Sequence, residues 1–246
     1  MSPGLHVVRA GVGPPLLLIH GSATDHTAWS IQLAGDLTRR FSLIAYDRRG
    51  GSVEDEAVDA ASLITERTLV VGSSFGAVVA LEVLRRHRAN VAGAVLIEPP
   101  MGKSDDAPAA PATFLDEFDR IARTEGGPAA GEMFLRMVLG DAMYARIPTA
   151  FQERSKARWA EIRADSAALI AYRPRYAELR AIETPVQLVG GARSAGYFRP
   201  TLDALFATLP DSRLEIIPGA GHMLQAEAHR RFAEVVTAFA ADVRLS

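Results

Sequence analysis

The short pattern Gly72-x-Ser74-x-Gly76 constrains the fold of this chain more than any other feature. It follows the apolar run 68–71, which is rich in β-branched residues, and precedes the long apolar run 77–84. A strand that reverses into a helix within one residue has space only for small residues two positions before and after the apex. The pattern therefore predicts a strand, a very tight turn and a helix, with Ser74 at the apex.

Ser74 is the candidate nucleophile of this turn. Its hydroxyl would stand clear of the sheet at the positive end of the following helix, where the amide of Phe75 could stabilise a developing oxyanion. A chance turn rich in glycine and serine is the alternative, because a five-residue pattern with two free positions often arises by accident. The strand before the pattern and the helix after it favour the nucleophile.

Apolar runs along the chain alternate between strand and helix patterns. Segments suited to buried strands lie at 15–20, 41–46, 68–71, 91–97, 184–190 and 213–218, with a short edge strand at 5–9. Between 101 and 182, helical patterns near 113–125, 128–139 and 148–172 replace the strands. We predict an α/β protein with a doubly wound, mostly parallel sheet, in which residues 1–101 and 182–246 form the core and residues 102–181 an inserted helical cap.

Two loops at the ends of predicted strands carry further candidate residues. Residues 20–22 (His-Gly-Ser) follow the first buried strand, and a glycine there lets the backbone turn sharply, so the amide of Ser22 or Ala23 is a natural second oxyanion donor. An ordinary connecting loop is the alternative. His222 lies in a glycine-flanked loop after the last strand, where its imidazole can swing towards Ser74 as the base, the alternative being a surface histidine.

Two helices are expected from local patterns in the first third of the chain. Residues 29–40 are amphipathic, with Trp29, Leu33 and Leu37 on one face, and predict a helix. The acidic residues between Glu54 and Asp59 open another helix, where negative charge suits the N-terminus. We interpret this acidic run as a solvated helix face and not as a metal site, because it lacks loop-ligand spacing and histidines.

Composition and charge narrow the classes of partner. The formal net charge is −2 and no block of Lys or Arg is present, so neither nucleic acid nor an anionic membrane surface is implied. Cysteine is absent, which excludes disulfides, thiol nucleophiles and cysteine-ligated metals. Because the sequence has no dinucleotide fingerprint and no histidine-rich ligand cluster, we expect no cofactor and no metal, and a small-molecule substrate as the partner.

The remaining expectations concern location and assembly. The first residues do not combine a basic segment with an apolar one, and no stretch approaches 18 uninterrupted apolar residues. We therefore expect a cytoplasmic protein. The sequence carries no signal for an oligomeric state.

Taken together, these motifs resemble the α/β-hydrolase superfamily across essentially the whole chain. Its landmarks occur in the expected order: the His20-Gly21 oxyanion loop, the turn that begins at Asp47, the elbow at Ser74, a helical cap, and the loop that ends in His222. In detail the chain is similar to small actinobacterial serine hydrolases of the esterase and lactonase type. The resemblance implies an acyl-transfer enzyme with Ser74 as nucleophile and His222 as base.

The acid of that family's triad is missing from its usual place. The aspartate most often follows the strand after the cap, and the family's pattern puts Ser194 at this position, where a serine cannot stabilise an imidazolium electrostatically. The superfamily includes members, such as some haloalkane dehalogenases, that keep the acid at the end of the strand after the elbow helix. Glu98 ends that strand here, so we predict Glu98 as the acid, with a bare Ser-His pair or another carboxylate as the alternative.

Three function classes remain compatible with these residues. The leading hypothesis is hydrolysis of an ester, lactone or thioester of a small hydrophobic substrate through an acyl-enzyme. Serine at the elbow argues against haloalkane dehalogenases and epoxide hydrolases, which need an aspartate to form an alkyl ester. A C–C bond hydrolase or natural-product cyclase would use the same site, and a hydrolase-like binding protein would keep the pocket without turnover.

Overall fold

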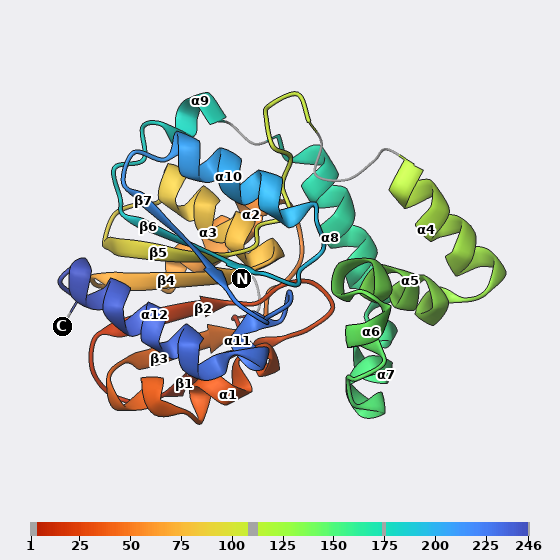
Figure 1. Ribbon diagram of the computed structural model, residues 1–246, viewed down its shortest axis with the longest axis horizontal. Helices are drawn as coiled ribbons and strands as arrows, with labels where there is room; N and C mark the ends of the chain where they lie inside the picture. Colours follow the sequence, from red (N-terminus) through yellow and green to blue (C-terminus); the bar gives the residue numbers. More distant parts are fainter. Residues whose placement is uncertain (1–3, 108–112, 174–175, 246) are drawn as a thin grey trace.

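Apolar runs form one seven-stranded sheet in the computed structural model, which describes residues 4–107, 113–173 and 176–245 (Figure 1). The strand order is β1-β3-β2-β4-β5-β6-β7, and every neighbouring pair is parallel except β1 and β3. The strands are β1 (Val7–Ala10), β2 (Pro15–Ile19), β3 (Ser42–Tyr46), β4 (Thr68–Ser73), β5 (Val91–Ile97), β6 (Val186–Gly191) and β7 (Ser212–Ile217). The predicted mostly parallel sheet is confirmed.

Helices cover both faces of the sheet, because the side chains of each buried strand alternate between two apolar layers. Leu17 and Ile19 of β2 pack into one layer, and Leu16 and Leu18 pack into the other. The first layer is closed by α2 (Val53–Ser62), α3 (Phe75–Arg86) and α10 (Phe198–Thr208), and the second by α1 (Ser30–Leu33) and α12 (His229–Asp242), after the short α11 (Leu224–Glu227) (Figure 1).

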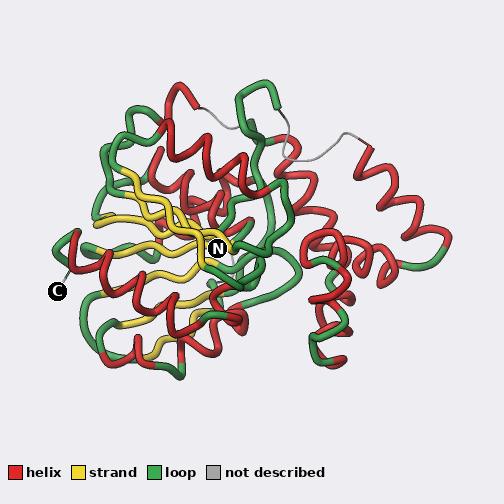
Figure 2. Tube along the Cα trace, in the orientation of Figure 1, coloured by secondary structure: helices red, strands yellow, loops and turns green. Residues whose placement is uncertain are grey.

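A helical insertion lies between β5 and β6. It comprises α4 (Thr113–Thr124), α5 (Gly127–Leu139), α6 (Asp141–Tyr144), α7 (Thr149–Ala157) and α8 (Trp159–Ala171), and α9 (Tyr176–Leu179) leads back to the sheet. The insertion forms a lobe of helices and loops at one side of the sheet (Figure 2). Its apolar interior is built around Phe118 and Ile162 and receives Ala23 from the loop after β2. Residues 108–112 and 174–175 of the predicted cap lie outside the described residues.

One local helix prediction and the interpretation of the acidic run as a solvated helix face are wrong. Residues 29–40 form short pieces, the 3-10 helices η1 (His26–Trp29) and η2 (Asp36–Arg39) on either side of α1, because Gly35 has extended backbone angles and interrupts the helix. The acidic run opens α2 as expected, but Glu56 is fully buried and faces Arg48. No helix in the described part of the chain is long and apolar enough to cross a membrane.

Candidate active site

Ser74 lies at the junction of β4 and α3, with φ +55° and ψ −122°. Close packing around it explains the glycines on either side. A Cβ atom on Gly72 would lie 2.2 Å from the carbonyl oxygen of Gly76, and a Cβ atom on Gly76 would lie 2.3 Å from that of Ile19. Neither separation is possible for a larger residue without moving the backbone. The predicted strand, tight turn and helix around Ser74 are therefore present.

The loop after β2 lies directly against Ser74. A Cβ atom on Gly21 would be 3.0 Å from the Cβ atom of Ser74, so this glycine permits the close approach of the two segments. Ser22 follows in the loop, and Phe75 is the first residue of α3, where backbone amides have no partner within the helix. The two predicted oxyanion donors thus belong to segments that flank Ser74.

His222 forms a close pair with Glu98. The His222 Nδ1 atom is 2.6 Å from the Glu98 Oε2 atom, and both side chains are buried, with exposed fractions of 7% and 1%. One face of the His222 imidazole stacks on the ring of Phe198; the ring centroids are 4.3 Å apart and the two ring planes make an angle of 10°. The structure brings the predicted acid and the predicted base together and adds Phe198, which no motif in the sequence indicated.

Glu98 is fixed through both of its carboxylate oxygens. While Oε2 faces His222, Oε1 accepts a hydrogen bond of 2.7 Å from the backbone amide of Gly191, at the end of β6. Glu98 directly follows β5, which pairs with both β4 and β6. The sheet register therefore holds the carboxylate between the elbow and the loop that follows β6.

Ser194, at the family's usual position for the acid, has a different environment. It lies in the turn after β6, beside Gly191, where a Cβ atom on the glycine would be 2.8 Å from the Ser194 hydroxyl oxygen. Within the described residues, that buried hydroxyl has no hydrogen-bond partner. The carboxylate at His222 Nδ1 accordingly comes from Glu98, directly after β5, and not from this turn.

Positive φ angles concentrate around these residues. Five non-glycine residues in the described part of the chain have a positive φ, and three of them are Ala23, Ser74 and Glu98. Each such residue costs on the order of 1 to 3 kcal/mol and persists only when its surroundings enforce it. Strained backbone of this kind is typical of functional sites.

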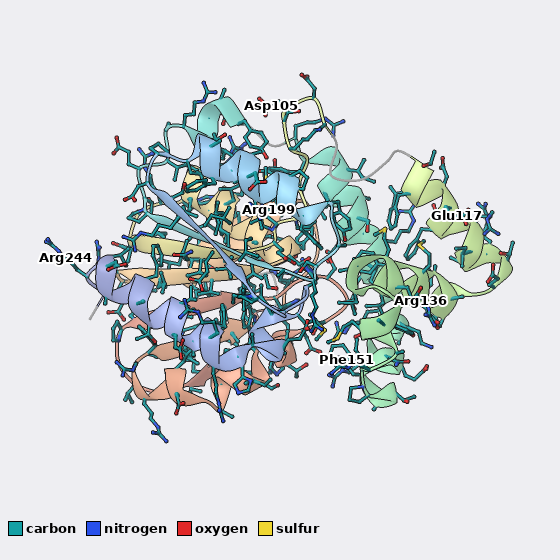
Figure 3. The ribbon with its side chains drawn as sticks, viewed as in Figure 1. Asp105, Glu117, Arg136, Phe151, Arg199 and Arg244 are labelled. Carbon is teal, nitrogen blue, oxygen red and sulfur yellow. The ribbon has the colours of Figure 1, made fainter. Side chains whose placement is uncertain are left out.

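Ser74 and His222 line a common cavity of about 370 Å³ between the sheet and the helical insertion. The loop after β2 contributes Gly21, Ser22 and Ala23 to the lining. Helix α7 contributes Phe151, whose side chain is labelled in Figure 3. Helix α5 and the segment after it contribute a continuous apolar part of the wall, with Phe134, Leu135, Val138, Leu139, Met143, Ile147 and Pro148. The candidate residues thus open onto a space suited to an apolar group.

His20 is a buried, neutral imidazole at the start of the loop after β2. Its Nδ1 atom lies 2.7 Å from the carbonyl oxygen of Gly21, and its Nε2 atom accepts a 3.1 Å hydrogen bond from the amide of Arg48. An imidazole that donates at one nitrogen and accepts at the other carries no charge. Burial lowers the pKa of His20 to about 3, and the Arg48 guanidinium acts in the same direction.

This low pKa predicts a specific pH dependence of stability. Between about pH 6.5 and pH 3 the unfolded chain binds a proton at His20 and the folded chain does not, so the free energy of unfolding falls as the pH is lowered through this window. The contribution is about 1.4 kcal/mol per pH unit. Urea unfolding from pH 7 to pH 4.5 should give a steeper loss for the wild type than for His20→Gln. If the free energy of unfolding fell equally with pH in both proteins, His20 would not be the buried neutral group that causes this dependence.

A cluster of two histidines and one aspartate lies outside the cavity. The ligand atoms of His6, His26 and Asp47 all lie within 4.8 Å of one another, and His26 Nδ1 is 2.7 Å from the Asp47 carboxylate. These three residues could hold a metal ion. Sequence reasoning recognised no such cluster, because the antiparallel pairing of β1 and β3 brings His6 next to Asp47, and their separation in the chain has no ligand spacing.

Comparison with known proteins agrees with this architecture. The chain is 33% identical over 99 residues to the uncharacterized hydrolase YraK of Bacillus subtilis, a match that covers 34% of this chain and 36% of that relative's length. A thermophilic esterase from Thermogutta terrifontis superposes with a TM-score of 0.80 at 24% identity, covering 99% of this chain and 96% of that chain. The enol-lactonase from Burkholderia xenovorans LB400 gives 0.79 at 20% identity, with 96% of each chain covered.

At these identities the solved structures establish the fold, and the family follows from the sequence. The alpha/beta hydrolase family matches residues 16–235, from β2 into α12, a range that holds Ser74, Glu98 and His222. Because the match takes in most of the chain and the sheet has the corresponding architecture, this chain belongs to the alpha/beta hydrolase family.

Proposed function

We propose that this protein is a serine hydrolase that cleaves an ester, lactone or thioester of a small hydrophobic substrate through an acyl-enzyme. The observation that carries the proposal is the 2.6 Å contact of His222 Nδ1 with buried Glu98, in a cavity that Ser74 also lines. The similar folds of an esterase and an enol-lactonase support the reaction class. A nucleophile, a base and an acid that orients the base are the parts that such a reaction needs.

The proposed reaction begins with proton transfer from Ser74. With Nδ1–H of His222 donating to Glu98, the Nε2 atom carries no proton and can accept that of the serine hydroxyl as Ser74 attacks the carbonyl carbon. Negative charge develops on the carbonyl oxygen, where the amides of Ser22 and Phe75 would stabilise it. His222 then protonates the leaving group, and the acyl-enzyme forms.

Water completes the cycle by the same route in reverse. His222 takes a proton from water, the resulting hydroxide attacks the acyl carbonyl, and collapse of the second tetrahedral intermediate returns the proton to Ser74. The buried Glu98 carboxylate offsets the positive charge of the imidazolium in both halves of the reaction. Acid, base and nucleophile are thus all regenerated, and no external reductant or oxidant is required.

The apolar wall supplied by the insertion favours a hydrocarbon acyl or alcohol group in the substrate. In a p-nitrophenyl ester series, kcat/KM should rise with each added methylene by roughly fourfold, from about 0.8 kcal/mol per buried methylene, until the chain outgrows the cavity. Val138→Phe should shorten the preferred chain, because Val138 lines the cavity. Met137→Phe on the adjacent, exposed position is the matched control and should leave the preference unchanged.

Ester turnover, fluorophosphonate labelling and ligand binding together separate the proposed hydrolase from its alternatives. Turnover of simple esters supports the hydrolase. Labelling of Ser74 by a fluorophosphonate without turnover of any ester would point to a C–C bond hydrolase or a cyclase that uses the same residues. Tight ligand binding without labelling would point to a non-catalytic binding protein.

A further inference from the structure

The guanidinium of Arg48 joins the helical insertion to the core. Arg48 is the second residue after β3, and its side chain is 6% exposed. Two of its nitrogens donate hydrogen bonds to the Asp165 carboxylate on α8, with Nη2 2.6 Å from Oδ2 and Nη1 3.2 Å from Oδ1. This two-point geometry fixes the direction of the guanidinium as well as its position.

Two further contacts of this guanidinium lie at the two segments that flank Ser74. Its Nη2 atom is 3.4 Å from the carbonyl oxygen of Gly21, and its Cζ atom lies 4.3 Å from the centre of the Phe75 ring. The backbone amide of Arg48 also donates to His20 Nε2. That bond sets the tautomer in which His20 Nδ1–H donates to the same Gly21 oxygen.

A peptide bond is planar and trans, so its carbonyl oxygen and its amide hydrogen point in opposite directions. The Gly21 oxygen and the Ser22 amide belong to one such unit. Contacts to this oxygen from His20 and from Arg48 therefore fix the direction of the Ser22 N–H. The group that orients this amide is itself held by Asp165 of the insertion.

Burial makes this arrangement sensitive to the loss of any one charge. Arg48 faces the buried carboxylate of Glu56 at 3.5 Å in addition to Asp165. Burial opposes the charged form of Arg48, but Asp165 and Glu56 outweigh it and raise the pKa of the guanidinium above its usual value. A buried charge left without its partner typically destabilises a protein by about 3 to 5 kcal/mol.

We infer that Arg48 is a positioning residue that couples the docking of α8 to the geometry of the oxyanion hole. The inference rests on the proposed serine-hydrolase function. When Asp165 holds the guanidinium, the Gly21–Ser22 peptide and the Phe75 ring are held against it, and the two donor amides keep their directions. Without Asp165, the insertion can still close the cavity, but the Arg48 guanidinium no longer holds the Ser22 and Phe75 amides in their directions.

The decisive variant is Asp165→Asn, which keeps the shape of the side chain and removes its charge. We expect kcat for ester hydrolysis and the rate of fluorophosphonate labelling to fall together by roughly tenfold, below the 10²- to 10³-fold cost of losing one oxyanion donor. KM should change little, because the apolar wall of the cavity is untouched. Unchanged kcat in folded Asp165→Asn would overturn the inference.

Arg158→Gln is the matched control. It breaks a second ion pair between insertion and core, from Arg158 at the start of α8 to Asp25 in the loop after β2. Among the described residues, the Gly21 oxygen accepts from His20 and Arg48 and not from Arg158. We therefore expect kcat within about twofold of the wild type, since partly exposed pairs contribute little. An equal loss of kcat in Arg158→Gln and Asp165→Asn would show that the Arg48–Asp165 pair only docks the insertion on the core, and would contradict the inference.

Arg48→Lys tests whether the planar, two-pronged guanidinium (the fork) is required. This variant is preferred to Arg48→Met, which would leave two buried carboxylates unpaired and could prevent folding. A lysine ammonium keeps the charge near Asp165 but lacks the planar fork that reaches Gly21 and covers Phe75. We expect a folded protein, by circular dichroism and thermal unfolding, with the kcat loss of Asp165→Asn. Full activity in Arg48→Lys would refute a role for the fork.

Hydrogen exchange gives a readout that does not depend on catalysis. In Asp165→Asn, amides of residues 21–25 should exchange faster than in the wild type and in Arg158→Gln. Failure of the proposed function would appear separately, as a wild-type protein that is not labelled or a Ser74→Ala protein that still is. Equal exchange in all three proteins would contradict the coupling even if the enzyme were active.

Discussion

Ser74→Ala is expected to abolish labelling by a fluorophosphonate and to lower kcat for ester hydrolysis by on the order of 10⁴- to 10⁶-fold. Alanine removes the oxygen that would bond to the acyl carbon, and no acyl-enzyme can form. Binding in the apolar cavity and the oxyanion amides would remain, so a small residual rate over water is expected. Labelling is read by intact-protein mass spectrometry and the rate by release of p-nitrophenol.

The neighbouring serine provides the control for this experiment. Ser73 ends β4, lines the same cavity and is buried. Ser73→Ala should be labelled at close to the wild-type rate. If Ser74→Ala is still labelled while Ser73→Ala is not, the nucleophile has been assigned to the wrong serine, and labelling of both variants would exclude the elbow as its location.

Glu98→Gln should lower kcat by about 10²- to 10⁴-fold with the fold intact. An amide can present its NH₂ group to His222, which then holds its proton on the nitrogen that must accept the one from Ser74. The neutral side chain also cannot offset the charge of the imidazolium. The variant keeps its volume and can still accept from the Gly191 amide through its oxygen, so thermal unfolding and circular dichroism should show a folded protein.

Ser194→Ala is the companion variant. Because the Ser194 hydroxyl has no hydrogen-bond partner among the described residues, its removal should leave kcat within about twofold and change the free energy of unfolding little. A large loss of kcat in this variant, or none in Glu98→Gln, would contradict the assignment of the acid to β5. The pair of variants therefore tests the acid position directly.

The parts of this molecule that sequence reasoning predicted well are governed by local sterics or by motif order. The spacing around Ser74 is required wherever a strand turns into a helix within one residue, and the glycine contacts at this elbow bear that requirement out. Glu98 was predicted from its place at the end of the strand after the elbow helix, and it lies beside His222. Their catalytic roles remain predictions that the variants above test.

The parts that sequence reasoning missed depend on contacts between distant segments. Arg48 and Asp165 are 117 residues apart, and nothing in either neighbourhood marks them as partners. The acidic run that contains Glu56 is interpreted as a solvated helix face because it lacks metal-ligand spacing, yet Glu56 is fully buried, and the neighbouring Arg48 guanidinium makes this burial possible. The predicted helix at 29–40 failed for a local reason: amphipathic spacing favours a helix, but the interruption at Gly35 was not weighed against it.

The two contacts at the Gly21 oxygen also have an electronic consequence. A carbonyl that accepts from His20 and from a guanidinium is polarised, and hydrogen-bonded groups in series strengthen one another in a medium of low dielectric constant. Electron density drawn towards the oxygen leaves the nitrogen of the same peptide, and the Ser22 N–H becomes a stronger donor. The positive charge of the buried guanidinium, on the far side of the loop, thereby strengthens a donor at the cavity through a single peptide group.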